Sequence, residues 1–304
     1  MSLTTTRRPG DRVFSGLARG AGLLILVALA GVAAFLTVEA LPAFTAPPEA
    51  LAGAADLLAY VAPLAFGTLL AALLALLVAT PLALGVALVV SHYAPRPVAR
   101  VVGAAIDLLA AIPSVVYGLW GLAFLGVRLT PVYAWLSDHL GWLPLFAGPA
   151  SSTGRTILTA ALVLAVMVLP IITAITREIF AQTPVLHQEA ALALGATRWE
   201  MIRLAVLPHA RSGIVSAVML GLGRALGETM AVAMVLSASG VVTLDLVGAT
   251  NPSTIAANIA LTFPDSTGLS VNALLASGLA LFVITLAVNV AARLVVARSQ
   301  RSTR

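Results

Sequence analysis

Long hydrophobic runs dominate this sequence, and they determine the solvent in which the chain can fold. A helix needs about 20 predominantly apolar residues to span the hydrocarbon core of a bilayer. Six runs of roughly that length or longer follow one another along the 304 residues. Only 10% of the residues are charged, whereas about a quarter are charged in a typical soluble domain. We therefore expect an all-α, polytopic membrane protein with six transmembrane helices.

The expected spans cover residues 17–41, 61–90, 101–127, 156–176, 214–238 and 271–296. The second run contains Pro81, but each half is too short to cross alone, which favours one kinked helix. In the third run, Pro113 frees a backbone carbonyl that neighbouring protein or a wet cavity must satisfy. Residues 128–154 are expected outside the membrane, with room for a short surface or re-entrant helix.

Arginine supplies all 17 basic residues, and its distribution predicts the orientation. Segments 1–16, 177–211 and 299–304 contain arginine, whereas segments 42–60 and 239–270 contain none. Because cytoplasmic segments carry the excess of basic residues, we expect cytoplasmic tails at 1–16 and 299–304 and a cytoplasmic loop at 177–211. Residues 17–298 then form one transmembrane domain, with no separate soluble domain and no evident cleavable signal peptide.

The sequence lacks the residues that several classes of catalytic and metal sites require. The chain has no cysteine, and its histidines stand singly at positions 92, 139, 187 and 209, which is no metal-ligand spacing. There is no phosphate-binding loop, no HExxH and no nucleophile beside a base. Arginines at the ends of spans indicate membrane topology rather than nucleic-acid binding. We expect no catalysis, metal or cofactor in this chain, and an energy source on a partner.

A polar island of about 26 residues, Thr183 to Pro208, interrupts the hydrophobic pattern. Thr183 is expected to cap a helix over Pro184 to Leu194, which Gly195 ends in a left-handed conformation. Thr197 and Glu200 have the spacing of a capping box, so the island is expected to be two short helices hinged at Gly195. Composition alone favours an ordinary surface loop, but the small alanines of the first helix suit the close approach of another protein.

Arg224 and Glu228 lie four residues apart in the fifth expected span. Each charge costs about 2.5 to 3.5 kcal/mol or more at the bilayer centre, so both must face protein or water. A guanidinium binds an oxyanion through two charge-assisted hydrogen bonds, which favours an anion pathway over a structural ion pair. The neighbouring glycines 221, 223 and 227 are expected at close helix contacts.

Weaker candidates surround these two sites. Arg177 and Glu178 either clamp the polar island to the fourth span or form a surface pair. Asp107 is expected to be solvated or to cap a helix, and Tyr117 is a possible cavity-lining residue.

The polar island resembles a known motif. Glu189-Ala190-Ala191, three residues, Gly195, nine residues and Ala205-Val206-Leu207-Pro208 resemble the EAA loop of bacterial ABC-importer permeases, with Ala205 where isoleucine is usual. AAIPSVVYGLWGL (110–122), LPIITAITREIF (169–180) and MLGLGRALGETMAVAMV (219–235) resemble the permeases of phosphate importers. The similarity extends from about Arg12 to Arg298.

The resemblance implies a type I ABC-importer permease fold and a set of partners. These are a second, related permease in a heterodimer, a cytoplasmic ATPase dimer that binds the ATP, an extracytoplasmic phosphate-binding protein, and membrane lipid. It implies inorganic phosphate as substrate, with Arg224, Glu228 and Arg177 on its pathway. The ATPase would contact Glu189, Ala190, Ala191 and Gly195. The alternatives are a permease for another oxyanion, such as sulfate or molybdate, and a docking or signalling subunit for phosphate sensing.

Overall fold

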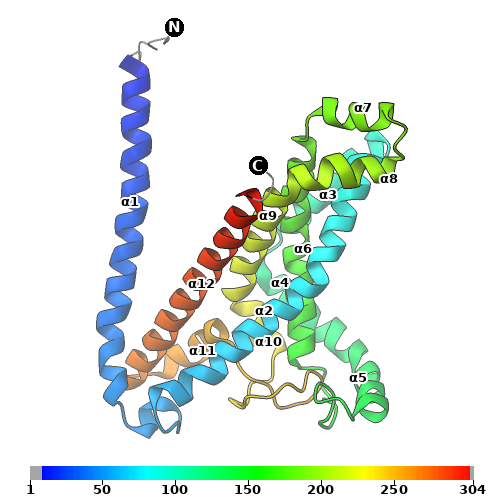
Figure 1. Ribbon diagram of the computed structural model, residues 1–304. Helices are drawn as coiled ribbons and strands as arrows, with labels where there is room; N and C mark the ends of the chain where they lie inside the picture. The colour runs from blue at the N-terminus through cyan, green and yellow to red at the C-terminus, as the bar shows by residue number, and fades with distance from the viewer. Residues whose placement is uncertain (1–8, 302–304) are drawn as a thin grey trace.

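The computed structural model describes residues 9–301, which are nearly all helical (Figure 1). The long helices are α1 (Pro9–Ala40), α2 (Leu57–Leu88), α6 (Ile157–Ala181), α9 (Leu207–Leu226) and α12 (Leu269–Arg301). The shorter ones are α3 (Arg96–Ala110), α4 (Ser114–Trp120), α5 (Val127–Leu140), α7 (Val185–Ala193), α8 (Arg198–Met201), α10 (Met230–Val235) and α11 (Ile255–Thr262). Three 3₁₀ segments, η1 (Leu41–Thr45), η2 (Pro48–Leu51) and η6 (Phe263–Asp265), and three π-helical segments, η3 (Val89–Tyr93), η4 (Gly121–Gly126) and η5 (Ile202–Val206), complete the helical elements.

The centre of the molecule is the contact between α2 and α6. The face of α2 toward α6 consists of alanines that are at most 1% exposed, at positions 71, 72, 75, 79 and 83. Their small side chains let α6 approach closely and pack its buried Leu164, Val168 and Ile172 into the same cluster. Lipid tails are as apolar as these side chains, so close van der Waals packing has to stabilise the pair.

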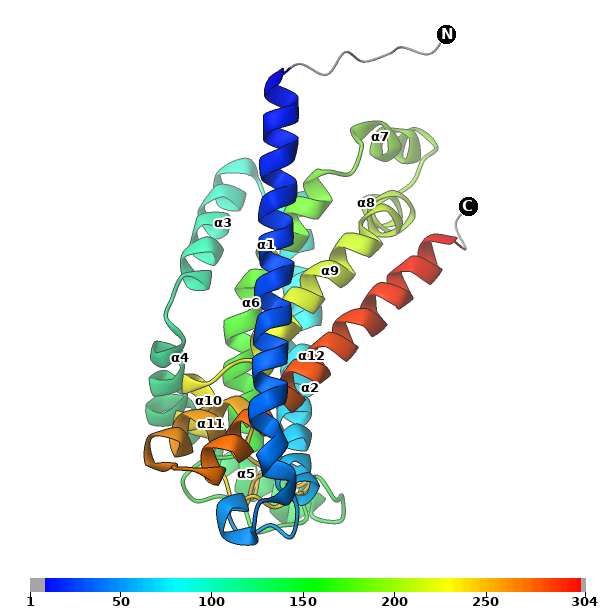
Figure 2. The ribbon, with the colours of Figure 1, turned by 90° about the vertical axis from the view of Figure 1, so that its left-hand side faces the viewer.

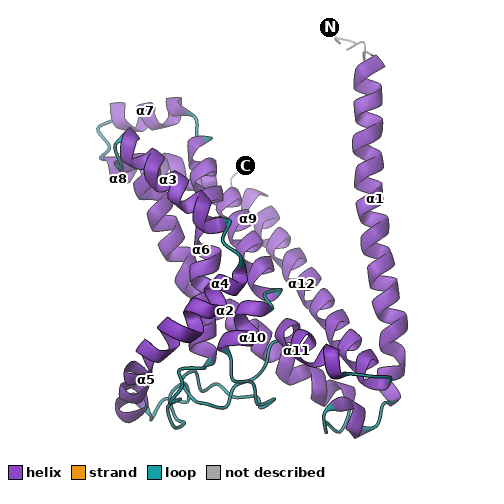
Figure 3. Cartoon of the chain, turned by 180° about the vertical axis from the view of Figure 1, so that it is seen from behind, coloured by secondary structure: helices purple, strands orange, loops and turns teal. Residues whose placement is uncertain are grey.

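Helix α1 stands apart from this core, and it meets the rest of the chain near its last turns (Figures 1 and 3). There, the side-chain amide of Asn272 on α12 donates to the backbone oxygen of Glu39 at 2.7 Å and to its Oε2 at 3.2 Å. The most apolar stretch of α1 buries none of its residues. One whole face of this helix is therefore free in the single chain.

Six helices of the described chain are long and apolar enough to cross a membrane. They are Val13–Thr45, Leu57–Tyr93, Ser114–Leu140, Ile157–Ala181, Arg198–Leu226 and Leu269–Leu294. The first, second, fourth and sixth cover nearly the same residues as the expected spans, but the third and the fifth do not. Of the expected tails, residues 1–8 and 302–304 lie outside the described range, whereas Pro9 and Arg301 already belong to α1 and α12.

The third candidate span is Ser114–Leu140 rather than 101–127. The chain breaks at Pro113, which separates α3 from α4 (Figure 2). Proline cannot donate to the carbonyl four residues earlier, here that of Leu109. The hydroxyl of Tyr117 donates to that oxygen at 2.8 Å. The freed carbonyl thus finds a protein donor, and Tyr117 joins α4 to α3.

The fifth candidate span is Arg198–Leu226 rather than 214–238. Helix α8 continues through the π-helical segment η5 into α9 without a break, and α9 ends at Leu226. Gly227 follows as the C-terminal cap, and the chain turns before α10 begins. Apolar residues resume in α10 after Glu228, which is why a span placed by hydrophobicity alone extends past the helix end at Leu226.

The long loops gather at the end of the molecule opposite α7 (Figure 3), and a single asparagine holds several of them. Asn251 is fully buried. Its Oδ1 accepts from the amide of Ile157 at 2.9 Å, and its Nδ2 lies 3.2 to 3.3 Å from the carbonyl oxygens of Arg155, Ser237 and Gly248. One side chain thus connects the start of α6 with the segment between α10 and α11.

We expect Asn251→Ala to lower the melting temperature of the purified protein by on the order of 5 °C, because it leaves a buried amide and several carbonyls without partners. Thermal unfolding followed by tryptophan fluorescence measures this. Asn289→Ala is the matched control, since the exposed Asn289 makes one local bond to Thr285. Equal effects of the two substitutions would contradict the role of Asn251.

Candidate functional site

The polar island begins with α7 at one end of the molecule, here called the loop end. Pro184, not Thr183, occupies the N-cap position of α7, and no side chain caps this helix. The Thr183 hydroxyl is buried without a hydrogen-bond partner, while the Gln188 side chain donates to the Thr183 carbonyl at 3.3 Å. The prediction of a threonine cap is therefore wrong, although the helix itself is present.

Gly195 ends α7 in the predicted conformation, with a φ of 87°. The amide of Gly195 donates to Leu192 at 3.0 Å, and the amide of Ala196 donates to Ala191 at 3.2 Å. These two bonds are the Schellman arrangement, in which a left-handed residue satisfies the last carbonyls of a helix. A β-carbon added at Gly195 would meet no atom within 4 Å, so the backbone conformation and not crowding requires glycine there.

The predicted capping box is confirmed at the next helix. The Thr197 hydroxyl accepts from the amide of Glu200 at 3.3 Å, and Glu200 Oε2 accepts from the amide of Thr197 at 2.8 Å. This helix is not short, however, because it continues into α9 as far as Leu226. The island therefore consists of one short helix, a glycine turn and the first part of a long membrane helix.

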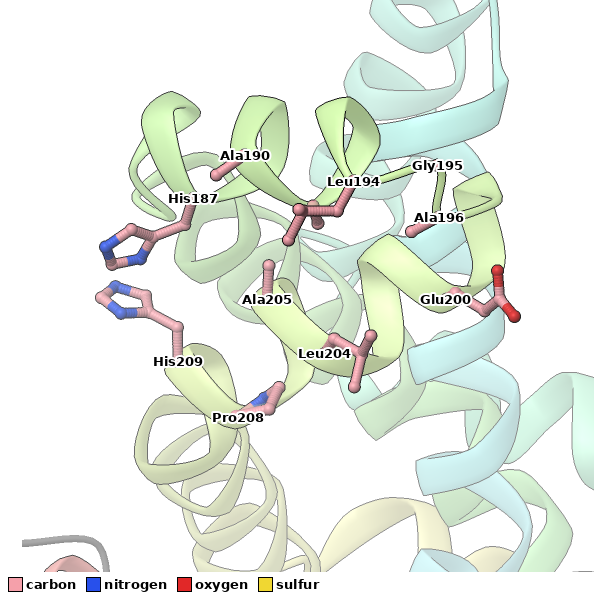
Figure 4. Close-up of a pocket in the computed structure, with 11 residues that line it drawn as sticks. His187, Ala190, Leu194, Gly195, Ala196, Glu200, Leu204, Ala205, Pro208 and His209 are labelled. Atoms are coloured by element: carbon pink, nitrogen blue, oxygen red, sulfur yellow. The ribbon is translucent and has the colours of Figure 1, made fainter.

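A groove of about 1120 Å³ lies between α7 and the start of α8–α9 (Figure 4). Ala190, Ala191 and Gly195 line it, whereas the exposed Glu189 does not. His187 and His209 lie opposite each other at its edge, from α7 and α9. Three of the four predicted ATPase-coupling residues therefore share one concave surface, which we call the loop groove.

Apolar side chains on both sides of the loop groove differ sharply in exposure. Beneath it, Phe180, Ile202 and Val206 are at most 1% exposed and join α6 to the start of α9. Leu194, which lines the groove, is 90% exposed, and Leu186, outside it on α7, is 73% exposed. The loop is thus firmly anchored to the membrane helices and presents large apolar side chains outward, which is typical of a protein-docking surface.

Arg224 and Glu228 line a second concavity of about 480 Å³, which we call the arginine hollow. They do not lie on one continuous helix as expected. Arg224 is in the last turn of α9, whereas Glu228 follows the helix end and its Oε1 accepts from the amide of Ala231 in α10 at 3.1 Å. Within the described chain, an ion pair is recorded for Arg177 but none joins Arg224 to Glu228. Glu228 is 8% exposed.

The glycines around the arginine hollow have different roles. A β-carbon at Gly221 would approach Ile172 of α6 to 2.8 Å, so Gly221 is at the predicted close contact. Gly223 faces open space, and Gly227 approaches only a backbone oxygen of its own chain segment, at 3.6 Å. The last two glycines line the hollow and keep side chains out of the space beside Arg224, so close packing was the wrong expectation for them.

Two residues that sequence reasoning did not assign hold α10, and with it Glu228, in place. A β-carbon at Gly118 of α4 would come within 2.8 Å of the Ala231 backbone. At the other end of α10, the Arg155 guanidinium donates to the carbonyl of Leu236 at 3.1 Å. Neither contact has a signal in the sequence, because the partners are more than 80 residues apart in the chain.

Arg177 lies away from both concavities. Its guanidinium lies against Gly103 of α3 and is 3.8 Å from the Asp107 carboxylate. It therefore joins α6 to α3, neither clamping the polar island nor pairing with Glu178. In the part of the chain that the structure describes, no three His, Asp or Glu side chains gather in a metal-binding arrangement.

Comparison with known proteins identifies the family. A sequence family described as "Binding-protein-dependent transport system inner membrane component" matches residues 79–304. This chain belongs to that family. It is a multi-pass membrane protein, as its six apolar helices also show, and the family's place is the bacterial cytoplasmic membrane.

Individual relatives agree with this assignment over nearly the whole chain. A Mycobacterium tuberculosis protein named "Phosphate transport system permease protein PstC 2" is 45% identical over 299 residues, which cover 94% of this chain and 91% of that protein. A Mesorhizobium japonicum protein named "Phosphate transport system permease protein PstC" is 38% identical, with 95% and 90% covered.

Solved structures confirm the fold. A chain of a bacterial ABC transporter involved in the import of the acidic polysaccharide alginate superposes with a TM-score of 0.59 at 17% identity, covering 96% of this chain and all of that one. A chain of the MetNI methionine transporter gives 0.50 at 18% identity, with 77% and 91% covered. The all-α fold expected from sequence is thus the fold of ABC-importer permeases.

We expect Gly195→Ala to loosen the α7 turn, because an L-residue in the left-handed region costs about 1 to 2 kcal/mol. Hydrogen exchange should be about tenfold faster at the amides of position 195 and of Ala196, which close the turn. Gly85→Ala is the control, since Gly85 is inside α2 with open space around it and alanine favours a helix. Unchanged exchange in Gly195→Ala would contradict the strain argument.

Proposed function

We propose that this chain is the permease subunit through which an ATP-driven importer moves inorganic phosphate across the cytoplasmic membrane. The proposal rests on the position of Arg224. This arginine belongs to a membrane-spanning helix and lines a hollow, and among the described residues no acidic side chain forms an ion pair with it. It stands in a chain that is 45% identical over 94% of its length to a protein named as a phosphate permease. A guanidinium fork suits a tetrahedral oxyanion.

The position of Glu228 favours phosphate over other oxyanions as the transported substrate. One of its oxygens accepts from Ala231, and its side chain borders the same hollow as Arg224. A carboxylate repels a fully deprotonated anion but accepts a hydrogen bond from one that keeps a proton. Phosphate keeps at least one proton at neutral pH, whereas sulfate and molybdate keep none. The pair Arg224 and Glu228 therefore suits phosphate better than these alternatives.

A second, related permease is part of the proposal, because two surfaces of this chain need a cover. Arg224 is exposed in the single chain although it lies in a membrane-spanning helix, and lipid cannot solvate an arginine there. A partner permease in a heterodimer would close the arginine hollow into a polar passage between the two chains. The free face of α1 offers further area for it.

The other partners follow from the two ends of the molecule. We place the loop end in the cytoplasm together with both tails, since Arg198, Arg203 and Arg211 lie in the segment that forms it. An ATPase dimer that binds and hydrolyses ATP would contact α7 there, through Glu189 and the apolar Leu194. A phosphate-binding protein would contact the opposite end. In this arrangement the chain itself is not catalytic and binds no cofactor.

Arg177 remains a candidate for the pathway at its cytoplasmic end. Its present partner is Asp107, whose side chain is 58% exposed. Contact with an anion would require Arg177 to leave that carboxylate, and an exposed ion pair costs little to break.

Reconstitution in vesicles tests the function directly. The two permeases, the ATPase and the binding protein are combined, and ATP-dependent uptake of phosphate and of sulfate is measured. Phosphate uptake that is lost when this chain is omitted supports the proposal. Faster sulfate uptake would favour the permease for another oxyanion, and phosphate uptake without this chain would favour a docking or signalling subunit.

We expect Arg224→Gln to abolish phosphate uptake, because glutamine retains a polar side chain but not the charge that stabilises the anion. Radiolabelled phosphate uptake and co-purification of the complex are measured together. The control is Arg128→Gln, which removes an arginine that rests on the ring of Phe124. Phosphate uptake at the wild-type rate by Arg224→Gln would show that Arg224 does not lie on the phosphate pathway.

We expect Glu189→Lys to uncouple ATP hydrolysis from transport or to weaken co-purification of the ATPase, because it reverses a charge on the exposed face of α7. Phosphate taken up per ATP hydrolysed is the measured quantity. Glu49→Lys makes the same charge change at the opposite end, in η2, and should leave this ratio unchanged. An unaltered ratio and an intact complex in Glu189→Lys would exclude α7 as the coupling element.

A further inference from the structure

A third concavity, of about 560 Å³, lies at the end of the molecule opposite α7. There α1 and η1, the start of α2 and the middle of α12 come together. This region is at the lower left of Figure 1. Ala40, Ala276 and Ala280 give it small-residue walls, and Phe44 and Leu58 extend beside it. Its lining is apolar except for Asp56. We call it the far-end groove.

The far-end groove opens within the membrane. Apart from Asp56, its lining residues belong to the candidate spans Val13–Thr45, Leu57–Tyr93 and Leu269–Leu294. Phe44 is 70% exposed and Leu58 is 75% exposed, so the groove is accessible from the side. An unfilled apolar groove forfeits dispersion contacts along its whole lining, and the hydrocarbon chains of lipid are the molecules that surround it.

Asp56 places a negative charge where the groove reaches the headgroup layer. It directly precedes α2, and its Oδ1 accepts from the amide of Ala59 at 2.7 Å. Its other oxygen makes no hydrogen bond within the described residues and remains available to a cation. Because the second span begins at the next residue, this carboxylate lies at the depth of a lipid headgroup.

The charges around the groove all have one sign. Glu39, Glu49 and Asp265 lie in or beside the segments at this end of the chain. No arginine or lysine occurs between residues 20 and 95 or between residues 225 and 292, the stretches that contain the residues lining the groove. A lipid with net negative charge is repelled by such a surface, whereas an ammonium headgroup is attracted to it.

We propose that the far-end groove binds one acyl chain of an aminophospholipid such as phosphatidylethanolamine, with the headgroup ammonium on Asp56. The alanine walls leave room for the chain, and the acidic end selects the headgroup. This binding site is separate from both the arginine hollow and the loop groove, and it does not depend on what the permease transports.

Photocrosslinking of the assembled transporter in lipid nanodiscs tests the proposal. The probe is phosphatidylethanolamine with a photoreactive group in one acyl chain, and the same chain on phosphatidylglycerol is the comparison. Mass spectrometry of the labelled peptides should place the crosslinks on α12 and on the segment from Ala40 to Phe44. Labelling by phosphatidylethanolamine should exceed that by phosphatidylglycerol about threefold, the size expected from one partly exposed charge interaction.

Two substitutions separate the acyl-chain site from the headgroup site. Ala280→Phe fills the groove and should reduce labelling at least about fivefold, whereas Ala287→Phe, seven residues along the same helix and outside the groove, should leave it unchanged. If Ala280→Phe fails to assemble, Ala280→Leu fills less of the space and replaces it. Asp56→Asn retains an oxygen that can cap α2 but loses the charge, so it should reduce the preference for phosphatidylethanolamine over phosphatidylglycerol.

Several results would overturn the assignment. Equal labelling of Ala280→Phe and Ala287→Phe, or labels scattered over all the helices, would show that the groove is not a lipid site. Lipid labels on the second permease, with none on the residues that line the groove, would show that a protein chain covers it. An unchanged lipid preference in Asp56→Asn would show that Asp56 does not select the headgroup.

Discussion

Close packing between α2 and α6 is the constraint on which the rest of the molecule depends. Two helices in lipid gain little from burying apolar surface against each other, so their backbones must come near enough for many van der Waals contacts. The alanine face of α2 meets this requirement against α6. The loop end is then built on the last turns of α6 through Phe180, and α9 packs beside α6 where Gly221 meets Ile172. Both candidate functional surfaces are therefore fixed to the same central pair.

Local chemistry explains which parts of the fold were predictable from sequence. The capping box at Thr197 and Glu200 and the left-handed Gly195 depend on interactions within a few residues, and both are present. Span boundaries depend on more than hydrophobicity. The break at Pro113 is stabilised by Tyr117 on the next helix, and after the break at Gly227 the apolar residues resume in α10. Sequence shows that proline or glycine is present but not whether tertiary contacts let the helix end there.

The candidate site likewise has features that were predictable from sequence and features that were not. Arg224 and Glu228 were predictable as a pair because intramembrane charges are rare and costly, and the structure brings both to one hollow. Their relation to each other was not predictable, since Glu228 lies beyond the end of α9 and accepts a hydrogen bond from the amide of Ala231 in α10. Arg155 and Gly118 hold α10 through contacts between segments far apart in the chain. Such contacts require knowledge of the packing, and no single-sequence pattern marks them.

The unbroken helix from Arg198 to Leu226 connects the loop end directly to the arginine hollow, so a tilt of the helix at the loop end displaces Arg224. At about 1.5 Å per residue, the roughly 26 steps from Arg198 to Arg224 correspond to about 39 Å. If the helix pivoted as a rigid rod about its loop end, a tilt of about 5° would move Arg224 sideways by about 3 Å. That displacement equals the length of a hydrogen bond, so a small rotation at one membrane surface is enough to make or break the contacts of an anion deep in the other half of the protein.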